Sequence, residues 1–238
     1  MADSDLDPLY FTNVKRFIPV LIVLCCCLQA GALEARGGFR LGTTVTMLAG
    51  EDWAFTKQDW ELYLETEAGV PVTASDYRGW GVTIGVLLEL SLVHFVALQP
   101  ELCYTTYHGG MRLQNDLWSG DWIKLGTVYR LAEAPILLKL RLSEKLSLLA
   151  GPSLMVRFIE PKAVLITPDD REDEPIADDS GYKRIACAVV GGIVYRGGGG
   201  IFLDLRYHFT LTSFDDFDAP WENDTLFHGV IASVGYLF

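Results

Sequence analysis

The chain ends on the segment His228-Gly-Val-Ile-Ala-Ser-Val-Gly-Tyr-Leu-Phe238, which decides the fold. Larger and smaller residues alternate in it, and side chains in a β-strand point to opposite faces at successive residues. One face would therefore be formed by Val230, Ala232, Val234, Tyr236 and Phe238. The pattern predicts that the chain closes on a β-strand with an apolar face.

Period-two patterns recur upstream and predict eight strands in all. The predicted strands are residues 39–48, 79–90, 94–107, 123–142, 146–158, 182–195, 200–213 and 227–238. The connections alternate in length: residues 49–78, 108–122, 159–181 and 214–226 are long, and residues 91–93, 143–145 and 196–199 are tight turns. Long extracellular loops and short periplasmic turns are typical of outer-membrane barrels. We therefore predict an all-β fold, an eight-stranded antiparallel up-and-down transmembrane β-barrel, with both barrel termini in the periplasm.

The strand phases separate an apolar outer face from a polar inner face. The residues predicted to face inward include charges of both signs: Arg40, Glu89, Glu101, Glu133, Lys139, Arg141, Arg157, Arg184, Asp204 and Arg206. Opposite charges in such a confined space should pair, because an unpaired charge there costs several kcal/mol. A barrel of about eight strands has an interior just wide enough for side chains to fill. We predict a lumen plugged by a charge network; a charged constriction that passes a solute is the alternative.

Residues 1–32 have the features of a removed secretory signal. Lys15 and Arg16 precede an apolar run, residues 17–28, and Ala30-Gly31-Ala32 supplies small residues at the spacing that a signal peptidase reads. The run is shorter than the roughly 20 apolar residues of a membrane-spanning helix. Residues 33–238 would then form one barrel domain with two cysteines, Cys103 and Cys187, too few for a disulfide framework.

Five sequence features resemble a known family. The terminal aromatic, Phe238, resembles the residue that forms part of the assembly signal in bacterial outer-membrane barrels. The other four are Gln99-Pro-Glu-Leu102, residues 131–141 with Pro135 and Lys139, Ala150-Gly-Pro152, and Arg206-Tyr207. In this order they resemble strands of the small outer-membrane β-barrels that include PorT-like proteins and, more distantly, OmpX-, OmpA- and OmpW-like barrels. The resemblance implies an outer-membrane location, with membrane lipid and the barrel assembly machinery as partners, but no single activity.

The predicted long loops are acidic and contain several aromatic residues. Residues 167–181 contain Asp169, Asp170, Glu172, Asp173, Glu174, Asp178 and Asp179, and residues 214–226 contain Asp215, Asp216, Asp218, Glu222 and Asp224. Solvation of surface loops is the simpler interpretation, and a site for divalent cations or a basic host surface is the alternative. The loop aromatics, Trp53 and Phe217 among them, fit an interfacial belt or a rim that contacts a ligand.

The sequence offers little support for catalysis. Its four histidines show no metal-ligand spacing, and no nucleophile elbow or serine motif accompanies them. We predict neither a cofactor nor a metal site. The net charge of -12 disfavours nucleic acid as a partner. We predict a structural or adhesin-like interaction protein with a possible host or extracellular ligand at its loops. The alternatives are transport of small hydrophobic molecules, as in OmpW-like barrels, a secretion-machine accessory role, as in PorT-like proteins, and a barrel enzyme.

Overall fold

The computed structural model describes residues 34–69, 71–115, 122–158, 162–166, 171–175, 185–212 and 226–238. The predicted signal, residues 1–32, and the predicted lumen residue Arg184 lie outside these ranges. The elements are β1 (Glu34–Ala49), α2 (Glu51–Ala68), β2 (Thr73–Val93), β3 (Val96–Gln114), β4 (Trp122–Arg141), β5 (Leu146–Arg157), β6 (Lys162–Ile166), β7 (Arg171–Pro175), β8 (Ile185–Arg196), the 3-10 turn η1 (Gly198–Gly200), β9 (Ile201–Thr210) and β10 (Leu226–Leu237).

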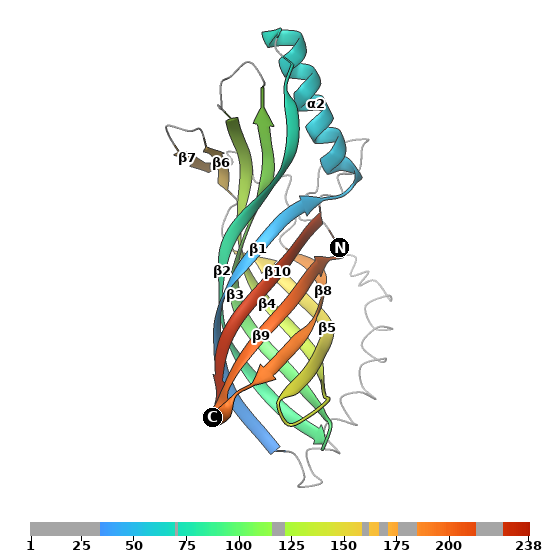
Figure 1. Cartoon of the computed structure of the whole chain (residues 1–238), viewed down its shortest axis with the longest axis vertical. Coiled ribbons are helices and arrows are strands. Elements are labelled where there is room, and N and C mark those ends of the chain that lie inside the picture. The colour runs from blue at the N-terminus through green and yellow to red at the C-terminus, as the bar shows by residue number, and fades with distance from the viewer. Residues whose placement is uncertain are drawn as a thin grey trace, which may run out of the picture.

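Eight of these strands form a closed antiparallel ring. The neighbours run in the order β3-β2-β1-β10-β9-β8-β5-β4, and pairing between β3 and β4 closes the ring. Figure 1 shows the barrel with the C-terminus at its lower end. The short connections β2–β3, β4–β5 and β8–β9 also lie at this end, which we call the turn end. The predicted eight-stranded up-and-down barrel is confirmed.

Alternating strand faces divide the wall as predicted. In β9, for example, Leu203 and Leu205 are exposed on the outside, whereas Asp204 and Arg206 are buried inside. The same alternation runs along β5 and the lower part of β3. A wall that is apolar outside and polar inside is the pattern of a transmembrane barrel, because lipid faces one side of every strand. In the part of the chain that the structure describes, no helix is long and apolar enough to cross a membrane.

The prediction that residues 49–78 form a long loop is wrong about their secondary structure. This segment contains the helix α2, which starts after Gly50 and ends at Gly69, whose φ of 64° is the left-handed conformation that favours glycine at a helix end. It also contains the start of β2, because this strand begins at Thr73 and not near residue 79. The sequence pattern hides this start because of a bulge, at which the β2–β3 register shifts between Arg78 and Thr83. A bulge moves the following residues to the opposite face, so the period-two pattern breaks there.

Strands β2, β3 and β4 extend beyond the ring at the end opposite the turns. Residues 73–78 of β2 pair with residues 109–114 of β3, and residues 122–128 of β4 complete this extension. The hairpin of β6 and β7 pairs with β4 at its side, so the third predicted loop, residues 159–181, also contains two short strands. We call these five strands together the blade. Figure 1 shows it rising above the barrel with α2 beside it.

Candidate functional site: the charge network of the lumen

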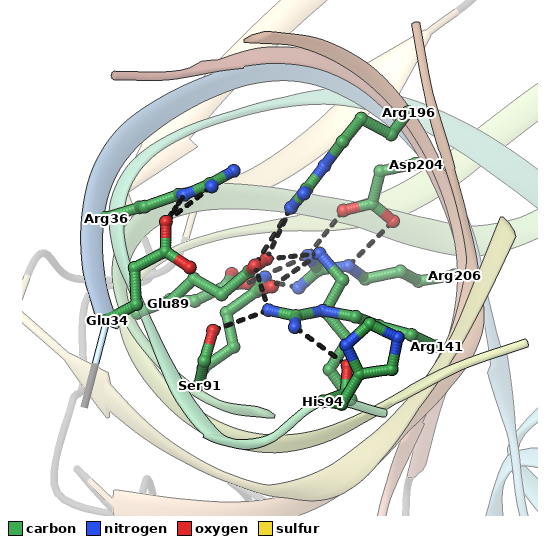
Figure 2. A network of polar contacts seen from close by, with 12 residues as sticks. Glu34, Arg36, Glu89, Ser91, His94, Arg141, Arg196, Asp204 and Arg206 are labelled. Carbon is green, nitrogen blue, oxygen red and sulfur yellow. Dashed lines mark hydrogen bonds and ion pairs between the residues drawn. The ribbon is translucent and has the colours of Figure 1, made fainter. Parts of the chain in front are cut away.

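The network begins at the turn end with one carboxylate, that of Glu89 on β2. Its side chain is fully buried and accepts hydrogen bonds from Lys139 Nζ at 2.6 Å and Arg141 Nη2 at 2.8 Å. Arg196 Nη2 on β8 adds contacts of 2.9 and 3.0 Å to the two oxygens of Glu89. Two strands of the ring, β4 and β8, thus send three cations to the same acid (Figure 2). We call these four residues the Glu89 cluster.

A second acid, Glu101 on β3, occupies the middle of the lumen. Arg206 from β9 donates two parallel hydrogen bonds of 2.8 and 2.9 Å to the Glu101 carboxylate. This is the bidentate geometry that a planar guanidinium offers a carboxylate. Arg40 from β1 adds an ion pair of 3.3 Å to Glu101 and one of 3.4 Å to Asp204. Asp204 also accepts a 2.8 Å hydrogen bond from Arg206. Two acids and two arginines balance here, and all four side chains are almost fully buried.

Gln99 joins the two groups into one network. Its amide nitrogen donates to Glu101 at 2.6 Å, and its amide oxygen accepts from Lys139 at 3.3 Å. Cations from β1, β4, β8 and β9 therefore meet acids from β2, β3 and β9 without a gap. The predicted charge pairing across the lumen is present for Glu101, Lys139, Arg141, Asp204 and Arg206.

Two predicted members lie apart from this network. Glu133 is buried, but its partner is the hydroxyl of Tyr107, and His208 Nε2 lies 3.8 Å away as an ion-pair partner only if the histidine is protonated. Arg157 is buried at the far end of β5, opposite Leu131 in register. Both residues are inward, as their phases predict. Arg157 is the last residue of β5, at the end away from the turns, whereas Glu133 lies in the middle of β4, opposite Cys103 and Met155 in register.

The sequence prediction missed Arg196 and did not place Ser91, whose hydroxyl accepts from Arg141 at 2.7 Å. Arg196 was assigned to a turn, but it is the last residue of β8 and shares the inner phase of Val190 and Val194. The signal was weak because both faces of β8 are apolar. Extending the phase of β8 by one more step would have placed Arg196 inside.

Above the network the lumen is filled with apolar and aromatic side chains. Tyr107, Tyr129 and Phe227 pack together, with ring centroids 4.8 Å apart for Tyr129 and Phe227 and 6.0 Å apart for Tyr107 and Phe227. They belong to one buried cluster that continues to Trp53 of α2. Groups packed in this way leave little room for water. We call this cluster the apolar cap.

The helix α2 is held over the blade by polar contacts around Asp76 of β2. Trp53 Nε1 and Lys57 Nζ donate to the Asp76 carboxylate at 2.9 and 2.8 Å, and Glu61 accepts from the backbone N–H of Ala74 at 2.6 Å. Partial burial raises the pKa of Asp76, but these two hydrogen bonds and the positive charges of Lys57 and Arg78 together bring it below its ordinary value. The helix therefore docks on the blade face that continues the barrel interior, where Met111 lies opposite Asp76.

The remaining predicted site residues are placed as follows. Phe238 lies beside β1 at the turn end, where its N–H donates to the carbonyl of Gly37 and its side chain is exposed on the outer wall. Glu172, Asp173 and Glu174 belong to β7. Asp169, Asp170, Asp215, Asp216 and Asp218 lie outside the described residues. Within the described ranges, no three His, Cys, Asp or Glu side chains lie close enough to hold a metal ion. The two described cysteines are not bonded to each other: Cys103 is buried and Cys187 is exposed.

No family model and no curated protein matches the chain. Among solved structures, it is similar to Ail, the attachment invasion locus protein of Yersinia pestis, in complex with the heparin analogue sucrose octasulfate, at 13% identity and a TM-score of 0.43 over 86% of this chain and 99% of that one. Neisserial surface protein A matches at 10% identity and a TM-score of 0.42, over 86% of this chain and 99% of that one. The outer membrane protein OprG from Pseudomonas aeruginosa matches at 9% identity and a TM-score of 0.31, over 87% of this chain and 95% of that one. The PorT-like resemblance stays a prediction.

Proposed function

We propose that this protein is an outer-membrane barrel that presents an interaction surface outside the cell, in an adhesin-like role. One observation carries the proposal: the barrel is filled, while three of its strands continue past the ring as a blade with its own docked helix. Strand β2 has 21 residues, about twice the 9–11 residues that a transmembrane strand needs. The part of the chain that extends beyond the membrane, the blade with α2, supports a role at the surface and not in the lumen.

The outer wall of β2 supports this division into a membrane part and an exposed part. From Trp80 to Leu88 the outside of β2 exposes Trp80, Val82, Ile84, Val86 and Leu88, a band suited to lipid. Above the bulge β2 carries Thr73, Ser75, Asp76 and Arg78. Trp80 lies at the border, where aromatic side chains are favoured at the membrane interface. The blade and α2 would therefore stand in water.

Surface labelling of intact cells tests the topology. Single cysteines are introduced by Glu65→Cys on α2 or by Lys145→Cys at the turn end, both exposed positions, in a Cys187→Ser background. A membrane-impermeant maleimide should label the α2 position in intact cells and the turn-end position only after permeabilisation. The opposite pattern would contradict the proposal.

An adhesion assay tests the function itself. Cells that display the protein should bind epithelial monolayers more than cells without it. Replacing residues 51–68 by a short glycine–serine linker should remove the excess, and Glu144→Ala, an exposed change at the turn end, should keep it. Equal adhesion of displaying and non-displaying cells, with the surface labelling intact, would rule out the adhesin-like role.

A lateral route for small hydrophobic molecules is the second candidate, because the outer wall is hollowed between β8, β9 and β10. The hollow has a volume of about 300 Å³ and is lined by Ile193, Tyr195, Leu203, Leu205 and Ala232 together with Asp204 and Ser233. Filling it by Ala232→Leu should slow uptake of a small aromatic hydrocarbon into vesicles that contain the purified protein. Uptake equal to that of protein-free vesicles would remove this candidate.

A further inference from the structure

We propose that the turn end of the barrel is a binding site for a small oxyanion, a carboxylate or phosphate group. A cavity of about 510 Å³ opens there, lined by Arg36, Arg141 and Arg196 with His94, Ser147 and neighbouring turn residues. Figure 2 shows the three arginines reaching inward from different parts of the ring. Nothing in the sequence pattern predicted this site, because it combines a strand start, a strand end and a residue assigned to a turn.

The charges around the cavity do not balance. The Glu89 cluster holds three cations, Lys139, Arg141 and Arg196, against one carboxylate. Lys139 is buried, but the side chains of Arg141 and Arg196 are 22% and 24% exposed, so both can reach a molecule in the cavity. Two positive charges beyond the one that Glu89 neutralises would be stabilised by an anion, since partly buried charges are weakly screened by solvent.

The acids on the cavity rim do not supply that anion. Glu34 is engaged by Arg36 at 2.5 Å, on the exposed edge of the mouth. Glu144 is exposed in the β4–β5 turn and makes no ion pair with any of the described residues. The nearest carboxylates are therefore either already paired or left in solvent.

The arginines also have hydrogen-bond donors to spare. Only Nη2 of Arg196 contacts Glu89; within the described ranges no acceptor reaches its Nε or Nη1. Arg141 is used more fully: its Nη1 donates to the carbonyl of His94 at 3.1 Å and its Nη2 to Glu89 and Ser91, and its Nε, which finds no acceptor in the described part of the chain, is buried. Arg196 therefore offers most of the free donors. A guanidinium presents its donors as a planar fork that matches a carboxylate or a phosphate. The Ser147 hydroxyl and the His94 ring border the same space and can orient a bound group.

The size of the cavity limits the ligand. About 510 Å³ is within the usual range for small-molecule pockets, roughly 300–1,000 Å³. It can hold an inorganic anion or the acidic end of a larger molecule such as a sugar acid. The shared chemistry is the oxyanion, and the probes below separate phosphate from carboxylate. This inference does not rest on the adhesin-like role.

Calorimetric titration of the full purified barrel in an uncharged detergent tests the site. Inorganic phosphate and citrate are the probes, with chloride at equal ionic strength as the blank. We expect saturable binding of at least one probe. Arg196→Gln should weaken it about tenfold or more, because a charge-assisted hydrogen bond is lost. Lys145→Gln removes an equal charge from an exposed residue of the β4–β5 turn that does not line the cavity, and it should change the affinity less than about twofold because an exposed charge is screened by solvent.

A third variant reverses the direction of the effect. Glu89→Gln removes the competing carboxylate, so anion binding should become tighter, whereas simple damage to the barrel would weaken it. Arg36→Gln, on the exposed rim, replaces Arg196→Gln if that variant does not fold. Absence of saturable binding for both probes would overturn the proposal. Equal weakening by Arg196→Gln and Lys145→Gln would also overturn it, because the effect would then be general surface charge.

Discussion

Glu101 is the residue on which the filled lumen depends most. Its carboxylate is fully buried and is shared by Arg206 and Arg40, which are themselves buried. We expect Glu101→Ala to lower the free energy of unfolding by roughly 3–5 kcal/mol, because two buried guanidinium groups, those of Arg40 and Arg206, then share the single carboxylate of Asp204. Urea unfolding in lipid vesicles measures this. Glu144→Ala, in the exposed turn, is the control and should change the stability by less than about 0.5 kcal/mol. Equal stability of the two variants would mean that water reaches Glu101.

Asp76 makes the docking of α2 depend on pH. Its pKa lies below the ordinary value because Lys57 and Trp53 donate to the carboxylate and nearby positive charges favour its ionised form, which together outweigh burial. A lowered pKa means that the stabilisation is present above the ordinary pKa of aspartate and is lost as the pH falls through the lowered value. Amide hydrogen exchange in residues 51–68, corrected for the intrinsic rate, should therefore increase in acid. Asp76→Asn should flatten this dependence; an unchanged pH profile in that variant would contradict the assignment.

At the scale of elements, the strands could be predicted where their period is unbroken. The alternation of residue types predicted both the inward and outward faces and the approximate ends of β9 (residues 201–210) and β5 (residues 146–157). It did so because lipid on one side and a polar lumen on the other favour opposite residue types. The bulge between Arg78 and Thr83 hid the start of β2, and the helix α2 lay in a stretch interpreted as loop. Arg196 was missed because both faces of β8 are apolar. The contacts within the network depend on register, which the sequence alone does not fix.

The outer face of β9 belongs to the membrane in this account. Leu203 is exposed on that face, between Ile201 and Leu205. Leu203→Arg should cost roughly 2–4 kcal/mol near the bilayer midplane, since a charge would face hydrocarbon. Leu203→Val is the conservative control. Unfolding in vesicles compares the two, and a tolerated arginine would place β9 outside the membrane.

The closing strand β10 ends on the residue that the sequence marks as an assembly signal. Phe238 bonds to Gly37 of β1 through its backbone and leaves its ring on the outer wall. Because the ring is not part of the core, we expect Phe238→Ala to reduce the yield of membrane-inserted protein while barrels that do form keep their heat-modifiable migration. A Phe238→Tyr control should insert normally. Unchanged yield for the alanine variant would remove the assembly role.

At the scale of the whole molecule, two layers of buried side chains close the barrel, one after the other. The charge network occupies the half nearer the turns, and the apolar cap occupies the half below α2. A continuous water path would have to separate ion pairs in one half and aromatic contacts in the other. The blade and α2 then remain as the part of the protein that is free to meet a partner.

Conductance across a planar bilayer is the most direct test of this closure. Purified barrel inserted from detergent should give no discrete conductance steps, with insertion verified by heat-modifiable migration of the recovered protein. The double change Glu101→Ala with Tyr107→Ala should open steps if it still inserts, because it removes a partner from the network and a ring from the apolar cap. Discrete, reproducible steps from the unaltered protein would contradict the filled barrel and make transport through the lumen the better account.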